Sequence, residues 1–179
     1  MTPFKSIGLI FTIAVLCGCN RSEESAGTPA SPAVGSQGAS SSNAFAAVEP
    51  AAAGALEVPC AIDKINAQAA AGRVVNVEAG RDIRFTGWIS DATKQVPSKF
   101  TIVLAGPGTY GVSGVAGISR PDVARALGSP ALAKAGFNVS ATLGSVAVGK
   151  YAVYFVEDAS GKPARCTTNT HLEVVKPAG

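Results

Sequence analysis

The chain has 179 residues, of which 47% are hydrophobic and 15% are charged, and its formal net charge is +3 at pH 7. So small a charge, without any block of like charges, argues against a nucleic-acid partner and against a polyanion-binding tail. Once a leader and a linker are subtracted, the length leaves room for one folded domain.

The first 19 residues have the pattern of a secretory signal. Lys5 supplies a positive charge and precedes an apolar run of ten residues, Ile7 to Leu16. A membrane-spanning helix needs about 20 apolar residues. The run therefore has the length of a signal-peptide core and is too short for a mature anchor.

The tetrad Leu16-Cys17-Gly18-Cys19 resembles the lipobox of bacterial lipoproteins, with Leu three residues before the acceptor cysteine and a small residue just before it. The resemblance implies that Cys19 is acylated and anchors the mature chain in a membrane. Asn20 follows, where an Asp would disfavour the outer membrane in the enterobacterial sorting pattern. We therefore expect a lipid-anchored protein of the bacterial cell envelope, in the outer membrane, facing the periplasm or the surface. The alternative is an ordinary secretory signal with two incidental cysteines.

Residues 20–55 have a low-complexity composition rich in Ala, Ser, Gly and Pro, with Phe45 as the only aromatic residue. Such a segment buries too little apolar surface to offset the entropy lost on ordering. The sequence thus predicts a disordered linker at residues 20–55, between the signal at residues 1–19 and a domain at residues 56–179.

From Val58 onward, apolar and polar residues alternate, and turn-forming residues come at short intervals. This pattern predicts about eight short strands. The strands are expected at Cys60–Ile65, Val74–Val77, Ile83–Ser90, Phe100–Ala105, Tyr110–Val115, Phe137–Leu143, Tyr151–Glu157 and Arg165–Val174. Their number and spacing favour an all-β fold, an immunoglobulin-like β-sandwich, over a small open barrel.

One connection between the predicted strands lacks their alternating pattern. Residues 119–136 contain two segments, each with Pro near its start and Gly at its end. This asymmetry is typical of short helices. We expect a short helical insertion between the fifth and the sixth strand.

Two cysteines remain in the expected domain, Cys60 in its first strand and Cys166 in its last. In an exported protein such a pair most simply forms a disulfide. A metal site needs more ligands than two cysteines and one histidine readily supply, so we expect no metal and no cofactor. His171 lies five residues past Cys166, which places the two side chains on opposite faces of the strand and argues against a catalytic Cys–His pair.

Three short motifs, Gly87-Trp88-Ile89-Ser90-Asp91, Arg120-Pro121-Asp122-Val123 and Gly136-Phe137, resemble an uncharacterised β-sandwich module of bacterial envelope proteins. The resemblance covers most of residues 58–175. It implies the sandwich fold and an envelope setting, and it carries no activity.

Trp88 has two expected placements. Either Gly87 forms a bulge that turns the ring inward, or the ring lies on the outer face of the strand beneath the helical loop. Both placements make Trp88 a packing residue. The functional alternative is a stacking platform for a sugar.

Asp91, Arg120, Asp122 and Arg125 could form a polar cluster near the helical loop, and two carboxylates can hydrolyse a glycoside. However, Asp122 is expected in the first turn of a helix, where the helix dipole favours a carboxylate, and Asp91 is expected in a turn. Structural roles explain both residues, so we expect no catalytic residue.

These observations favour a non-catalytic binding or structural module that contacts another envelope protein or a glycan. Trp88, Arg120, Asp122 and Arg125 are the candidate contact residues. The alternatives are a periplasmic inhibitor, such as an immunity or phage-exclusion lipoprotein, and a glycan hydrolase.

Overall fold

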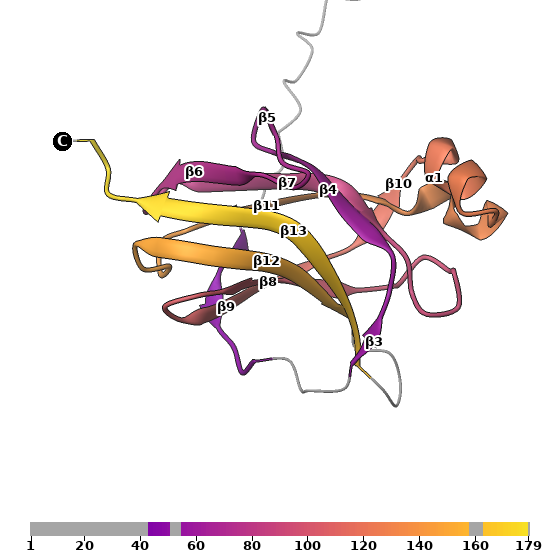
Figure 1. The fold of residues 1–179 in the computed structure, drawn as a ribbon, viewed down its shortest axis with the longest axis horizontal. Helices are drawn as coiled ribbons and strands as arrows, with labels where there is room; N and C mark the ends of the chain where they lie inside the picture. Colours follow the sequence, from indigo (N-terminus) through magenta and orange to yellow (C-terminus); the bar gives the residue numbers. More distant parts are fainter. Residues whose placement is uncertain (1–42, 51–54, 158–162, 179) are drawn as a thin grey trace, which may run out of the picture. The chain divides into compact units, whose positions relative to one another are not determined.

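Two β-sheets packed face to face make up the fold (Figure 1). The computed structural model describes residues 43–50, 55–157 and 163–178. The predicted signal, the predicted lipidation site Cys19 and most of the predicted linker lie outside the described residues. Within the described part, the all-β sandwich predicted from the sequence is confirmed.

Sheet A has six strands, and its neighbours are antiparallel except for the parallel pair β1 and β11. Its order is β1 (Asn43–Ala44), β11 (Gly136–Thr142), β7 (Asp82–Ile89), β4 (Cys60–Ile65) and β5 (Gln68–Ala69), and β10 (Ala116–Ile118) also pairs with β11.

Sheet B has seven strands, and β13 pairs in parallel with both β3 and β6. Its order is β2 (Ala46–Ala47), β9 (Thr109–Gly114), β8 (Phe100–Ala105), β12 (Gly149–Glu157), β13 (Ala164–Val175) and β3 (Leu56–Glu57), and β6 (Val74–Glu78) also pairs with β13.

The eight predicted strands are β4, β6, β7, β8, β9, β11, β12 and β13, and each begins and ends within two residues of its expected bounds. The other five strands of the described chain have two or three residues each. Strands so short carry no readable alternation, so their pairing depends on the neighbours that the fold supplies.

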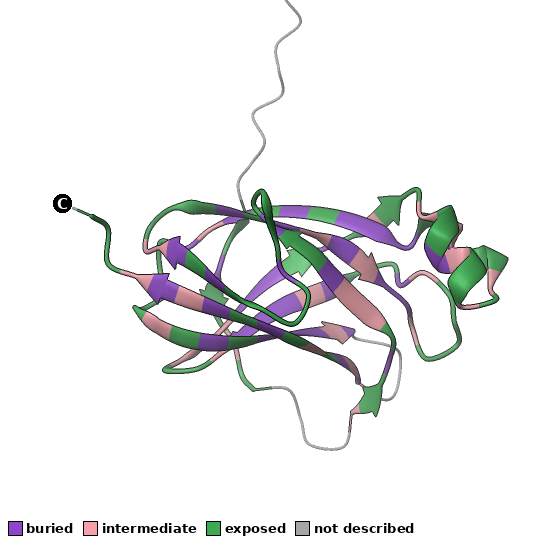
Figure 2. Cartoon of the chain, turned by 45° about the horizontal axis from the view of Figure 1, so that its top comes forward, coloured by how far each residue is buried: buried purple, intermediate pink, exposed green. Residues whose placement is uncertain are grey.

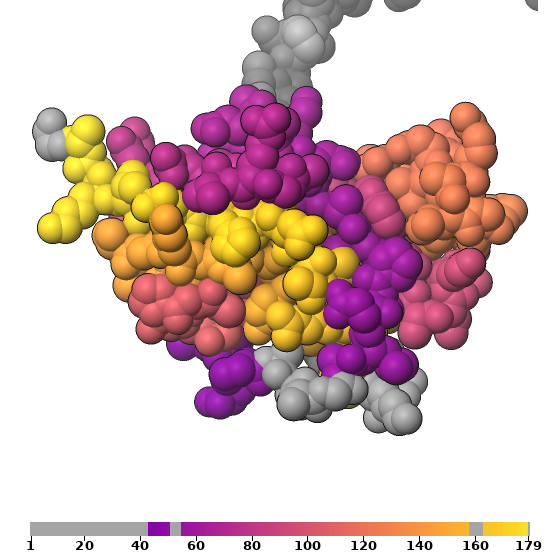
Figure 3. Space-filling model, viewed as in Figure 1, coloured from indigo at the N-terminus to yellow at the C-terminus, as the bar shows by residue number. Residues whose placement is uncertain are grey.

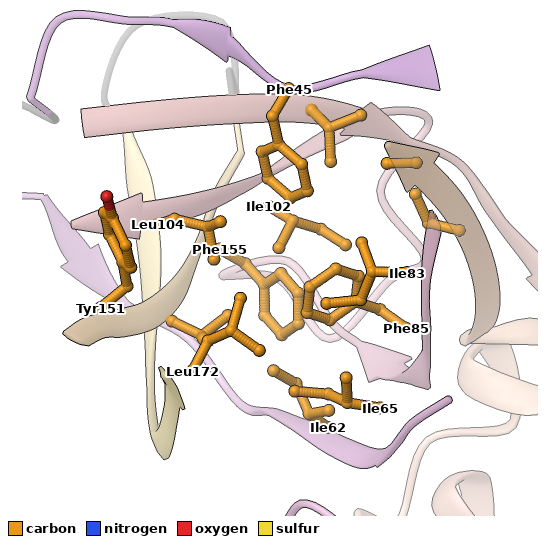
Figure 4. Packing of buried hydrophobic residues seen from close by; sticks show 14 of the residues in the cluster. Phe45, Ile62, Ile65, Ile83, Phe85, Ile102, Leu104, Tyr151, Phe155 and Leu172 are labelled. Atoms are coloured by element: carbon orange, nitrogen blue, oxygen red, sulfur yellow. The ribbon is translucent and has the colours of Figure 1, made fainter. Parts of the chain in front are cut away.

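Buried residues alternate with more exposed ones along most of β6, β7, β11 and β13, as the banding in Figure 2 shows, whereas β8 and β12 each contain three consecutive buried residues. The inward side chains form one core between the sheets (Figure 4). Cys166 is buried and His171 is exposed, so the predicted separation of these two residues on opposite faces of β13 is confirmed.

Strand β4 contains a bulge that changes which side chains face the core. The register with β7 shifts between Ile62 and Lys64, so Asp63 is an extra residue in β4. Without this residue, Ile62 and Ile65 would point to opposite faces, because their separation is odd. With it, both isoleucines are buried and Asp63 projects outward.

Strand β7 has no such bulge, and this settles the placement of Trp88. The pairing with β11 runs without a break across Gly87 and Trp88, and burial alternates through both residues. The bulge proposed at Gly87 is therefore wrong, and Trp88 lies on the outer face of sheet A. Gly87 instead faces the core, where an added Cβ would lie 2.8 Å from Cζ of Phe137 and would also overlap the carbonyl oxygen of Ala61.

The prediction of a disordered linker over all of residues 20–55 needs one correction. Residues 43–48, which we call the N-terminal strap, add β1 to sheet A and β2 to sheet B. Phe45 lies between these two strands, is 1% exposed and packs against Phe85 with its ring centroid 6.1 Å away (Figure 4). The folded domain therefore includes the strap, which pairs with both sheets and places Phe45 in the core between them.

We expect Phe45→Ala to lower the free energy of unfolding by about 3–5 kcal/mol, because it removes a fully buried aromatic ring and leaves a cavity. Phe45→Leu should cost clearly less, because it refills much of that space. Urea denaturation followed by circular dichroism measures both. If Phe45→Ala unfolds at the same urea concentration as the parent, the strap does not contribute to the core.

Candidate functional site

The helical insert, residues 119–135, is the candidate functional site. It contains α1 (Pro121–Ala126) and the 3-10 helix η1 (Pro130–Lys134), so the predicted insertion between the fifth and sixth long strands is confirmed. Pro121 stands at the start of α1, where a missing N–H costs nothing. Gly128 follows α1 with φ at +65°, a left-handed conformation that favours glycine. In Figures 1 and 3 the insert projects from one end of the sandwich.

A small apolar core of its own holds the insert on sheet A. Val123, Leu132 and Ala135 are buried at its centre. The half-buried side chains of Trp88, Val96, Ala124 and Leu127 pack around them. Trp88 is thus a packing residue beneath the insert, and its ring packs against the apolar cluster of the two short helices.

Arg120 links the insert to sheet A through Asp63 of β4, and within the insert it also pairs with Asp122 of α1. Its Nη1 donates to Oδ2 of Asp63 at 2.7 Å, and its Nη2 donates to Oδ2 of Asp122 at 2.8 Å. The Arg120 side chain is 21% exposed. Asp63 is the extra residue of the β4 bulge, so the bulge and the salt bridges are parts of one arrangement.

The same arrangement shifts two pKa values. The hydrogen bond from Arg120 lowers the pKa of the Asp122 carboxyl to about 2, and the charge of Arg120 contributes. The pKa of Arg120 is raised, first by its hydrogen bond with Asp122 and then, against the effect of burial, by the charge of Asp63. Asp122 therefore stays ionised as a partner of Arg120 and is unsuited to act as a general acid near neutral pH.

Asp91 lies apart from this pair and has a turn role. Its Oδ1 accepts hydrogen bonds from the backbone N–H of Thr93 at 2.8 Å, from Oγ1 of Thr93 at 2.9 Å and from the backbone N–H of Gln95 at 2.7 Å. Asp91 and Asp122 thus serve separate local structures, as the sequence suggested for each of them.

Arg125 is the member of the predicted cluster that has no ion-pair partner among the described residues. It is exposed in the last turn of α1 and lies beside an apolar hollow of about 480 Å³. The described residues that line the hollow are Pro121, Ala124, Arg125, Gly128, Pro130 and Ala133, among which Arg125 alone is charged. The hollow joins a small apolar surface to one cation, a combination suited to contact with another molecule.

The predicted Cys60–Cys166 disulfide is present. It joins β4 of sheet A to β13 of sheet B with the two Cα atoms 6.0 Å apart, inside the usual range for a disulfide. The bridged residues are separated by 106 positions, and in the chain-entropy model a loop of this size gives up to about 4.7 kcal/mol of stabilisation.

Glu157 is a titratable residue that the sequence analysis passed over. It ends β12, is 7% exposed and belongs to the inward set with Tyr151, Val153 and Phe155. Burial raises its pKa, and the negative charge of Asp91 raises it further. The sequence could have predicted the burial of Glu157, because Glu157 continues the every-second-residue pattern of Tyr151, Val153 and Phe155 and should therefore face the same side of β12.

No protein-family model matches the chain, and neither curated proteins nor solved structures gave a match. Within the described ranges, no three His, Cys, Asp or Glu side chains gather closely enough to hold a metal ion. In the same ranges we find no helix whose length and apolar content would let it span a bilayer.

We expect Arg120→Ala to raise the pKa of Asp122 from about 2 toward the ordinary value of 3.8, because the variant removes both the hydrogen bond and the charge. NMR titration of the side-chain carboxyl measures the shift. Arg125→Ala is the matched control and should leave the pKa of Asp122 unchanged. A depressed pKa that persists in Arg120→Ala would show that Arg120 is not its cause.

The ion pair between Arg120 and Asp122 also determines how the stability of the fold changes with pH. The pKa of Asp122 is lower in the folded chain than in the unfolded chain, so its ionised form stabilises the fold above about pH 4. That contribution is lost as the pH falls toward 2. The parent protein should therefore lose more stability than Arg120→Ala over this acid interval.

Proposed function

We propose that this chain is a lipid-anchored protein of the bacterial envelope that acts by contact, as a non-catalytic binding module with the helical insert as its contact surface. The anchor is inferred from the lipobox-like tetrad that ends at Cys19. The disulfide supports export, because such bonds persist in oxidising compartments.

The observation that carries the binding role is the apolar hollow beside Arg125. The insert that bears it is held on sheet A by its own apolar core and by the salt bridge between Arg120 and Asp63. A rigid platform loses little entropy when it meets a partner, so a small surface can bind usefully.

The chemistry of this surface favours a protein partner over a glycan. Trp88 packs beneath the insert, so its ring is not offered as a platform for a sugar. The exposed lining consists of Pro, Ala and Gly with one cation, which suits an apolar side chain flanked by a carboxylate. Asp91 and Asp122 are engaged in a turn and a salt bridge, so we propose no hydrolytic role for them.

The anchor can be tested directly on the mature protein. Mass spectrometry of the N-terminal peptide from a membrane fraction should find an acylated Cys19 as the first residue. Cys19→Ala should release the protein from the membrane while leaving the sandwich folded. An unmodified N-terminus at another residue would contradict the lipid anchor.

The contact surface can be tested with matched charge reversals. A photoreactive residue at position 125 should form a crosslink to an envelope protein in cells, and the same residue at exposed Asn169 should not. With that protein purified, Arg125→Glu should weaken binding at least tenfold, and Lys176→Glu should leave it unchanged.

Equal binding by Arg125→Glu and Lys176→Glu would show that the contact surface is not on the insert.

The non-catalytic role has its own test. Turnover of a peptidoglycan, glycan or ester substrate by the purified protein, abolished by Asp91→Asn or Asp122→Asn, would overturn it.

A further inference from the structure

The edge of sheet A has a gap between two short added strands. Strand β1 pairs with β11 at Ala141 and Thr142, and β10 pairs with β11 at Gly136 and Phe137. Within the described chain, Asn138, Val139 and Ser140 have no strand partner on this edge. A strand edge without a partner presents backbone N–H and C=O groups that another chain can pair with.

The facing edge of sheet B is open over the corresponding stretch. Strand β2 pairs with β9 at Tyr110 and Gly111, and no strand of the described chain pairs with the outer edge of β9 at Ser113 and Gly114. Val115 follows directly and is 65% exposed, more than any other large apolar side chain in the described part. The two open edges therefore border one groove.

This groove, which we call the edge groove, has a volume of about 540 Å³. Its lining residues are Asn43, Arg84, Lys99, Ser113, Gly114, Val115, Asn138, Val139 and Ser140. Arg84 and Lys99 are the charged members of this set, and the set contains no carboxylate.

The two cations of the edge groove have no acidic partner in the described chain. The salt bridges there are made by Arg81 and Arg120. Among the described residues, the side chain of Arg84 makes one hydrogen bond, a long one from Nε to Oγ of Ser140 at 3.4 Å. Two like charges beside one groove repel each other, and an anionic ligand would relieve that repulsion.

We propose that the edge groove binds an extended acidic segment of a partner polypeptide, which adds as a strand beside Asn138–Ser140 of β11. Its carboxylates would face Arg84 and Lys99, and its apolar side chains would contact Val115. Strand addition obtains affinity from backbone hydrogen bonds and specificity from alternate side chains.

A peptide fits these features better than other anions. The open backbone of β11 recognises another backbone, and the lining offers no aromatic ring on which a sugar could stack. The proposal is separate from the proposed function, because the lining residues of the edge groove and of the hollow on the insert do not overlap.

The test uses the full-length protein in detergent and three fluorescein-labelled octapeptides. One alternates Glu and Val, one alternates Lys and Val, and one is the Glu-Val peptide with every backbone nitrogen methylated. Fluorescence polarisation should detect binding of the plain Glu-Val peptide and at least tenfold weaker binding of the other two. Equal binding of the methylated peptide would overturn strand addition, because that peptide lacks the backbone donors.

Substitutions then locate the site. Arg84→Gln and Lys99→Gln should each weaken binding of the Glu-Val peptide at least fivefold. Arg73→Gln, an exposed cation that follows β5 at the opposite edge of sheet A, is the matched control and should bind like the parent. Equal effects of all three substitutions would show general charge attraction and would overturn the proposal.

Two other occupants of the edge groove are outcomes of the same experiment. If polygalacturonate competes with the peptide, and if its binding is weakened equally by Arg84→Gln and Lys99→Gln, the groove is a glycan site instead. A peptide that binds only after deletion of residues 20–42 would show that the protein's own chain fills the groove. Either result would overturn a partner peptide as the occupant.

Discussion

Three phenylalanine rings packed between the sheets set the geometry on which the rest of the structure depends. Phe137 comes from sheet A, and Phe100 and Phe155 come from sheet B, with ring centroids 5.0 to 5.6 Å apart. The cluster fits because two neighbouring core positions are glycines. A Cβ at Gly87 would lie 2.8 Å from Phe137, and one at Gly114 would lie 2.6 Å from Phe100.

This packing extends outward to the insert. Gly87 faces inward to make room for Phe137, so the regular alternation of β7 turns Trp88 outward. The outward ring of Trp88 then packs against the buried cluster of Val123, Leu132 and Ala135 in the insert. The aromatic core between the sheets thereby determines where the proposed contact surface is attached. It also gives a packing reason for Gly87 of the Gly-Trp motif and for Phe137 of the Gly-Phe motif.

The two open sides of the sandwich are closed by different means. On one, the disulfide links β4 of sheet A to β13 of sheet B. On the other, the N-terminal strap crosses from β11 to β9 and inserts Phe45 between the sheets. The strap covers part of each edge and leaves the middle of β11 open, which is why the edge groove exists beside it.

The sequence by itself determined the eight long strands, the helical insertion, the disulfide and the turn and helix-start roles of Asp91 and Asp122. These features follow from local patterns: alternation, Pro and Gly placement, and the pairing of two cysteines. Only the tertiary structure decided that Phe45 belongs to the core, because nothing near Phe45 in the chain signals a strand and its partners are on β7 and β11. The same holds for Arg120, whose link to Asp63 spans 57 positions and requires a bulge that alternation alone does not reveal. Contacts between distant segments come from how the sheets are stacked, and that depends on the shapes of side chains all along the core.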